Sequence, residues 1–160
     1  MKRRALFAAV SLALSYAGAT SAADPLVRFE GGIGVHPVAN TGVVNTVKGV
    51  APGGRPWAIQ KLKANIKQDG SVSISGEGLV LAATDAIGTR GGVLQVAAQL
   101  FCGAESFVSS AADLSVGGNF DIRGMLSAQP AAPCASPVLL IRNATGGTLG
   151  GWFAAGTLAD

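Results

Sequence analysis

Hydrophobic and polar residues alternate with a period of two along most of the chain, which is typical of half-buried β-strands rather than helices. The alternation is clearest in two neighbouring segments, 57–67 (WAIQKLKANIK) and 71–81 (SVSISGEGLVL). Between them lie Asp69 and Gly70, a pair that is favoured in the two-residue type I′ turn of a β-hairpin. The sequence therefore predicts an antiparallel hairpin with a type I′ turn.

Further strand patterns recur through the chain, with Gly, Pro and Asn between them as turn residues. They cover residues 26–33, 43–50, 93–102, 119–126, 137–143 and 151–155. The segment 93–102 (VLQVAAQLFC) is mostly apolar, which predicts a central strand covered on both faces. One helical turn is predicted, over 109–114. About seven or eight short strands joined by turns predict a single all-β domain over 24–160, an antiparallel β-sandwich or β-barrel.

Residues 1–23 have the pattern of an export signal. Cations at 2–4 precede an apolar stretch over 5–17, and Ala23 fits the position before a cleavage site, with Ala22 almost as good. The alternative is an uncleaved anchor helix, but the apolar stretch is shorter than the ~20 residues that span a bilayer. We therefore expect a secreted or periplasmic protein with no transmembrane segment in the mature chain.

The basic charge of the chain belongs to this signal. Three of the 12 Lys and Arg lie at residues 2–4, so the remaining nine balance the nine Asp and Glu, all of which follow the signal. The formal net charge of +3 therefore does not indicate a nucleic-acid partner.

Two cysteines, Cys102 and Cys134, are the only ones in the chain. In an exported protein the simplest expectation is one disulfide between them. The alternative is a pair of free thiols with one nucleophile, for which His36 is the only histidine that could act as base. His36 precedes Pro37 in a glycine-rich loop, so we interpret it as a loop residue.

Several segments resemble a group of exported bacterial proteins of unknown function. The matching segments are residues 49–59 (GVAPGGRPWAI), 101–102 (FC), 134–141 (CASPVLLI) and 152–154 (WFA). The resemblance implies an exported single domain with one disulfide, and it transfers neither an activity nor a site.

Candidate chemistry is sparse. One His and two Cys are too few to build a zinc site without carboxylates, so we expect no metal and no cofactor. A glycoside hydrolase needs only two carboxylates, about 5–9.5 Å apart. The candidates are Glu30, Glu77, Asp85, Glu105, Asp113 and Asp121. Among them, Glu77 should be the most accessible, because the glycines on either side of it have no side chains that could cover it. A carboxylate in such a position is, however, usually a solvated residue that discourages the pairing of strand edges.

One candidate site for ligand binding is formed by Trp57, Lys61, Lys63 and Lys67. The three lysines and Asn65 occupy every second position of the predicted strand, so their side chains should face water while the residues between them face the core. Trp57 belongs to the same set of alternate positions. Either a bulge near Gln60 therefore reverses the two faces, or Trp57 lies exposed beside the cations. The exposed arrangement would suit an anionic glycan, a lipid headgroup or an acidic envelope protein. The alternative is a solvated face whose lysines protect an edge strand.

The preferred functional hypothesis is an exported, non-catalytic β-domain with a binding or structural role at the cell envelope or outside the cell. One alternative is a hydrolase of an envelope or extracellular polymer that uses paired carboxylates. The other is a barrel that carries a small apolar ligand, because small residues such as Ala97 and Ala98 would leave room for a cavity.

Overall fold

The computed structural model describes residues 23–38 and 45–160, and this part of the chain consists of β-strands joined by turns and loops. The described residues contain no helix long and apolar enough to cross a membrane. The predicted signal peptide lies outside the described residues except for Ala23. The elements are β1 (Pro25–Gly34), β2 (Trp57–Ala58), β3 (Lys61–Lys67), β4 (Ser71–Glu77), β5 (Val80–Leu81), β6 (Gln95–Cys102), β7 (Glu105–Val108), β8 (Ala112–Asp113), β9 (Phe120–Met125), β10 (Val138–Asn143), the 3-10 turn η1 (Thr145–Gly147) and β11 (Trp152–Leu158).

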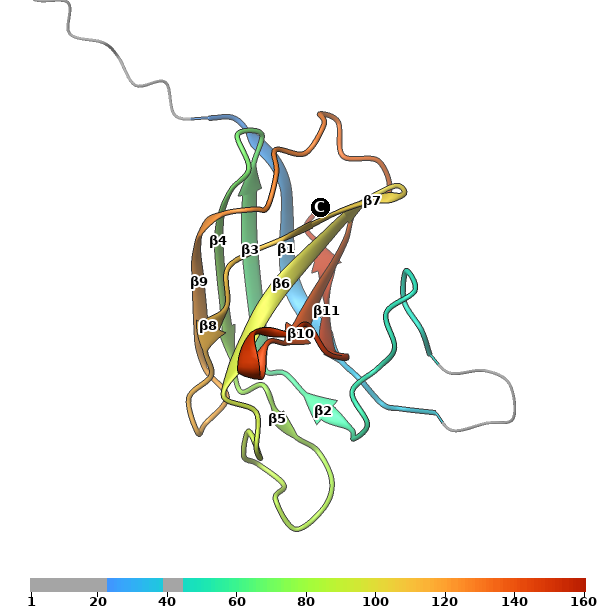
Figure 1. Ribbon diagram of the computed structural model, residues 1–160, viewed down its shortest axis with the longest axis vertical. Coiled ribbons are helices and arrows are strands. Elements are labelled where there is room, and N and C mark those ends of the chain that lie inside the picture. Colours follow the sequence, from blue (N-terminus) through green and yellow to red (C-terminus); the bar gives the residue numbers. More distant parts are fainter. Residues whose placement is uncertain (1–22, 39–44) are drawn as a thin grey trace, which may run out of the picture.

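Nine strands form one antiparallel sheet in the order β7-β6-β10-β11-β1-β3-β4-β9, and the ninth strand, β8, pairs with β6 outside this path. The sheet curls into a half-barrel, with β9, β4, β3 and β1 along one side and β6, β10 and β11 along the other (Figure 1). The two edges meet at one end, where the N–H of Ser127 donates to the carbonyl oxygen of Val108 at 2.8 Å. The predicted all-β fold is therefore confirmed, as a single curled sheet.

The predicted hairpin is confirmed as the β3–β4 pair, but its turn differs from the prediction. The N–H of Gly70 donates to the carbonyl oxygen of Lys67 at 3.0 Å, so Gln68 and Asp69 are the central residues of the turn. A type I′ turn needs positive φ at both central residues, whereas only Gly70 has it here, at +84°. The predicted turn type is wrong, and the connection is a three-residue loop that ends in a left-handed glycine.

The predicted strand 57–67 is interrupted at Ile59 and Gln60, which separate β2 from β3. β2 pairs with β5 in a small sheet of its own, and these two strands lie at one end of the half-barrel (Figure 1). The side chain of Trp57 is buried, with 3% exposed, and stacks on Phe153 with 4.2 Å between the ring centroids. The reversal of faces near Gln60 is therefore confirmed, and the alternative with an exposed Trp57 is wrong.

The hydrophobic core fills the curl of the sheet. The alternate residues Leu62, Ala64 and Ile66 of β3 are buried there, as the period of two predicts. β6 is buried on both faces from Val96 to its end, which confirms the central strand that its apolar run predicts.

Two predicted elements are wrong. The segment 109–114 forms no helical turn, because Ser109 bridges to Leu126 and β8 pairs with β6. The segment 43–50 lies partly outside the described residues, and its described part forms a tight turn, closed by two backbone hydrogen bonds between Val47 and Val50, rather than a strand.

The disulfide predicted between Cys102 and Cys134 is present, with 4.8 Å between the Cα atoms. It joins the end of β6 to the loop before β10, and the alternative of two free thiols is therefore wrong. A disulfide is compatible with an oxidising extracellular or periplasmic location.

Candidate functional site

The outward face of β1, β3, β4 and β9 is a grid of polar side chains, which we call the polar face. The strand registers align these residues in rows across four strands. One row contains Arg28, Asn65, Ser73 and Arg123, and the next contains Glu30, Lys63, Ser75 and Asp121. The grid exists because the inward residues of the same strands are apolar, so that the period of two sends every polar side chain outward.

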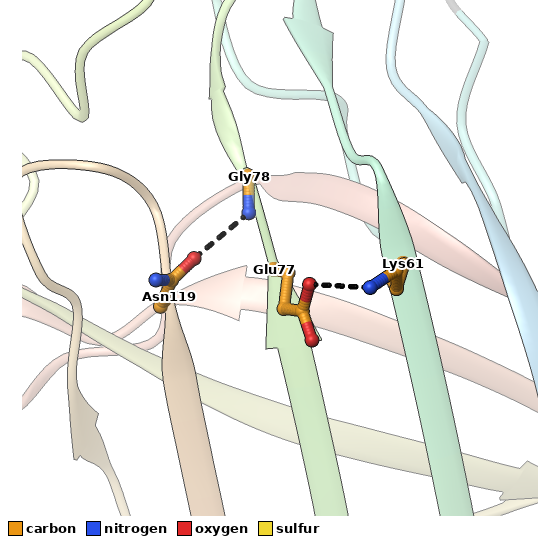
Figure 2. Close-up of polar contacts among 4 residues, drawn as sticks. All are labelled: Lys61, Glu77, Gly78 and Asn119. Atoms are coloured by element: carbon orange, nitrogen blue, oxygen red, sulfur yellow. Dashed lines mark hydrogen bonds and ion pairs between the residues drawn. The ribbon is translucent and has the colours of Figure 1, made fainter.

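Two ion pairs join neighbours on the polar face. The Nζ atom of Lys61 lies 2.9 Å from Oε2 of Glu77 on the next strand (Figure 2). The Nε atom of Arg123 lies 2.9 Å from Oδ1 of Asp121 on the same strand. All four side chains are at least half exposed, so each pair stabilises the fold by about 0.2–1 kcal/mol.

Three other cations of the polar face have no ion pair. Every Asp and Glu of the chain lies within the described residues, and none of them is within 4.0 Å of Arg28, Lys63 or Lys67. Glu30 lies opposite Lys63 in the strand register but does not reach it. The polar face therefore carries more positive than negative charge.

Asn65 lies among these cations, between Lys63 and Lys67 on β3. Its Oδ1 atom is buried and accepts no hydrogen bond from any described residue. A pocket of about 280 Å³ opens beside the Asn65 side chain, lined by Arg28, Glu30, Lys63 and Ser73 among others. A buried acceptor without a donor costs about 1–3 kcal/mol, so this position lowers the stability of the sheet.

The four residues that the sequence predicts for ligand binding do not all lie on one surface. Lys61, Lys63 and Lys67 share the polar face, as their parity predicts, whereas Trp57 lies in the core and does not contribute to this surface. Sequence reasoning missed Arg28, because its place beside β3 depends on the pairing of β1 with β3.

A second candidate is a broad, shallow groove of about 910 Å³ between β4, β9 and β8. It brings together Glu77, Asp113 and Asp121, three of the six candidate carboxylates. Each of the three already accepts a hydrogen bond or ion pair: Glu77 from Lys61, Asp121 from Arg123 and Asp113 from the side chain of Gln95 at 3.0 Å. All three side chains are exposed, whereas the general acid of a glycosidase usually lies against apolar side chains.

A hydrogen bond between neighbouring strands lies next to Glu77 at the edge of this groove. The N–H of the next residue, Gly78, donates to Oδ1 of Asn119 at 3.1 Å, and Figure 2 shows this bond beside the Lys61–Glu77 pair. The remaining candidate carboxylates lie elsewhere: Glu30 on β1, Asp85 in the loop after β5, and Glu105 at the start of β7.

The barrel hypothesis needs a cavity beside Ala97 and Ala98, and both of these small residues are buried in β6. Ala98 belongs to the continuous hydrophobic core, and Ala97 is 2% exposed.

His36 lies exposed in the loop after β1, where the sequence places it, and its carbonyl oxygen accepts a hydrogen bond from Asn45.

Comparison of the chain with protein-family models, with curated proteins and with solved structures finds no match.

Proposed function

We propose that this protein is an exported, non-catalytic binding domain whose polar face binds an anionic glycan at the cell envelope or outside the cell. The observation that carries the proposal is the set of cations without ion pairs on this face, Arg28, Lys63 and Lys67, which lie among uncharged polar side chains. An acidic polysaccharide complements such a surface, because its carboxylates or sulfates are negative and its hydroxyl groups exchange hydrogen bonds with the polar side chains.

Export rests on two observations that point the same way. Residues 1–23 have the pattern of a signal peptide, and the disulfide of the domain is compatible with an oxidising location. The intact mass of protein purified from its own host tests this directly. We expect a chain that begins at Asp24 or Ala23 and whose mass rises by about 2 Da on reduction. A chain that retains residues 1–23 would contradict cleavage.

Glycan binding is tested by titrating the protein with polygalacturonate and, in parallel, with neutral dextran. We expect polygalacturonate to bind and dextran to bind far more weakly, with an affinity for polygalacturonate that falls as salt is added, since exposed charges are screened. Lys63→Gln should weaken binding about two- to fivefold, which corresponds to the loss of one exposed charge contact.

Arg55→Gln is the matched control, since it removes one positive charge from an exposed loop outside the polar face. It should leave polygalacturonate affinity unchanged. Equal binding of the two polymers, or equal effects of the two substitutions, would contradict a specific role for the polar face.

The three carboxylates of the groove keep the hydrolase alternative as a second candidate. Its test is the pair Glu77→Gln and Asp113→Asn, because both side chains line the groove, whereas Asp85 lies away from it. If the wild type cleaves polygalacturonate and either substitution abolishes cleavage, the hydrolase replaces the binding domain as the better account.

A further inference from the structure

A second cationic site lies away from the polar face, around Arg142 on β10. The half-buried guanidinium is held by neutral groups: Nε and Nη2 donate to the carbonyl oxygen of Gly150, at 2.8 and 2.6 Å, and Nη1 donates to the side chain of Gln99. Gln99 is itself buried and donates to the hydroxyl of Ser106 at 3.1 Å. These bonds fix the direction of the guanidinium and leave an Nη1 N–H available for a further acceptor.

Arg142 has no counter-ion. All nine Asp and Glu lie in the described residues, and the two ion pairs found there involve other cations. Burial lowers the pKa of the Arg142 guanidinium, which means that its surroundings disfavour the charge. Arginine nevertheless remains protonated in proteins, so the site holds a positive charge that nothing in the chain neutralises.

Lys48 adds a second positive charge to the same pocket. It lies in the tight turn between Val47 and Val50, and its Nζ atom donates to the carbonyl oxygen of Gly103 at 3.1 Å. Its φ of +50° is in the left-handed region, which costs a residue with a Cβ about 1–2 kcal/mol. Residues held in that region often serve a binding function, and here the turn carries a cation to the pocket.

The pocket between this turn and the β6–β10 pair has a volume of about 500 Å³. Lys48, Arg142, Gln99 and Ser106 line it together with the apolar side chains of Val50 and Phe101, and no carboxylate is among its lining residues. A pocket with two cations, two further polar groups and no acid has a potential that attracts anions.

We propose that this pocket binds a small oxyanion, in the form of a phosphate, sulfate or carboxylate group. The oxyanion accepts hydrogen bonds from Nζ of Lys48, from the free Nη1 N–H of Arg142 and from the hydroxyl of Ser106. Charge-assisted bonds of this kind are about twice as strong as neutral ones. The site shares no lining residue with the polar face, so it is a separate function of the domain.

The test is a titration of ¹⁵N-labelled protein with sodium phosphate, sulfate and acetate in separate series, each at constant ionic strength maintained with sodium chloride. We expect saturable shifts of the amide signals of Gly49, Ser106 and Gly151, which surround the pocket. The series that saturates at the lowest concentration distinguishes a tetrahedral oxyanion from a carboxylate. Shifts that grow linearly with all three salts would overturn the proposal.

Lys48→Asn is the variant of choice, because Asn accepts a left-handed backbone and the substitution leaves the buried Arg142 network in place. It should weaken oxyanion binding about tenfold, as expected for the loss of one charged hydrogen bond. Arg55→Gln removes the same charge from an exposed loop outside both sites and should leave the oxyanion affinity unchanged. Equal losses in the two variants would show a general charge effect and overturn the site. The outcome is separate from the test of polygalacturonate binding, which uses Lys63→Gln on the polar face.

Discussion

The aromatic ring of Phe120 on β9 covers Gly76 on the neighbouring strand β4. The two residues are directly opposite in the strand register, and a Cβ on residue 76 would overlap the ring. The ring fills the space that a glycine leaves on a sheet surface and is itself buried, with 5% exposed. Phe120 also lines the groove that holds Glu77, so this contact shapes the wall of the groove.

Gly76→Ala should therefore lower the free energy of unfolding by about 1–3 kcal/mol, the usual cost of overpacking a buried contact. Urea denaturation followed by tryptophan fluorescence measures the change. Gly117→Ala is the control, because a Cβ at residue 117 would meet no other atom within 4 Å. Equal stabilities of the two variants would show that the ring moves aside without cost.

The unsatisfied Oδ1 of Asn65 predicts a cost in stability. Asn65→Val removes the buried acceptor and favours the strand, so we expect the free energy of unfolding, measured by urea denaturation, to rise by about 1–2 kcal/mol. Ser75→Val on the adjacent strand changes strand propensity but leaves in place both the acceptor and the hydrogen bond between Arg123 and Ser73, and it should gain less stability. An Asn65→Val protein no more stable than Ser75→Val would contradict the cost assigned to the acceptor.

The sequence predicts the strands well where buried and exposed residues simply alternate along the chain. The alternation in β3 and β4 places Lys63 outward and Ile74 inward without knowledge of the neighbours. The register between β1 and β11 likewise shifts at the glycines that follow Phe29, where Gly31 has a φ of +92°. These features depend on residues that are close together in the chain.

The sites could not be predicted in the same way, because they depend on pairings between distant segments. Asn65 is correctly placed on the outward face, but its neighbours across the sheet, Arg28 and Ser73, follow only from the pairing of distant strands. The pocket around Arg142 forms only because the turn at Lys48 packs over β6 and β10. No local pattern marks Arg142 as a cation without a counter-ion.

The disulfide should contribute a large share of the stability. It closes a loop with a sequence separation of 32 residues, which in the chain-entropy model stabilises the fold by about 3–4 kcal/mol. Replacement of Cys102 and Cys134 by Ala should lower the free energy of unfolding by about that amount. Guanidinium denaturation with and without a reductant measures it. The reductant should destabilise the wild type and leave the double variant unchanged, and a wild type that is insensitive to the reductant would contradict this account.

Asp69, in the β3–β4 turn, predicts a dependence of stability on pH. Hydrogen bonds from the side chain and the backbone N–H of Ser71, the latter at 2.8 Å, lower the pKa of the Asp69 carboxyl below its usual value of 3.8. A carboxyl whose pKa is lower in the folded state stabilises the fold above the unfolded pKa, and this contribution is lost as the pH falls through the folded pKa. Asp69→Asn keeps the acceptor oxygen but lacks the charge. The wild type should therefore be more stable than Asp69→Asn at pH 6, and the difference should shrink as the pH falls below 3.8. Urea denaturation of both proteins across this pH range checks the prediction, and a constant difference would refute it.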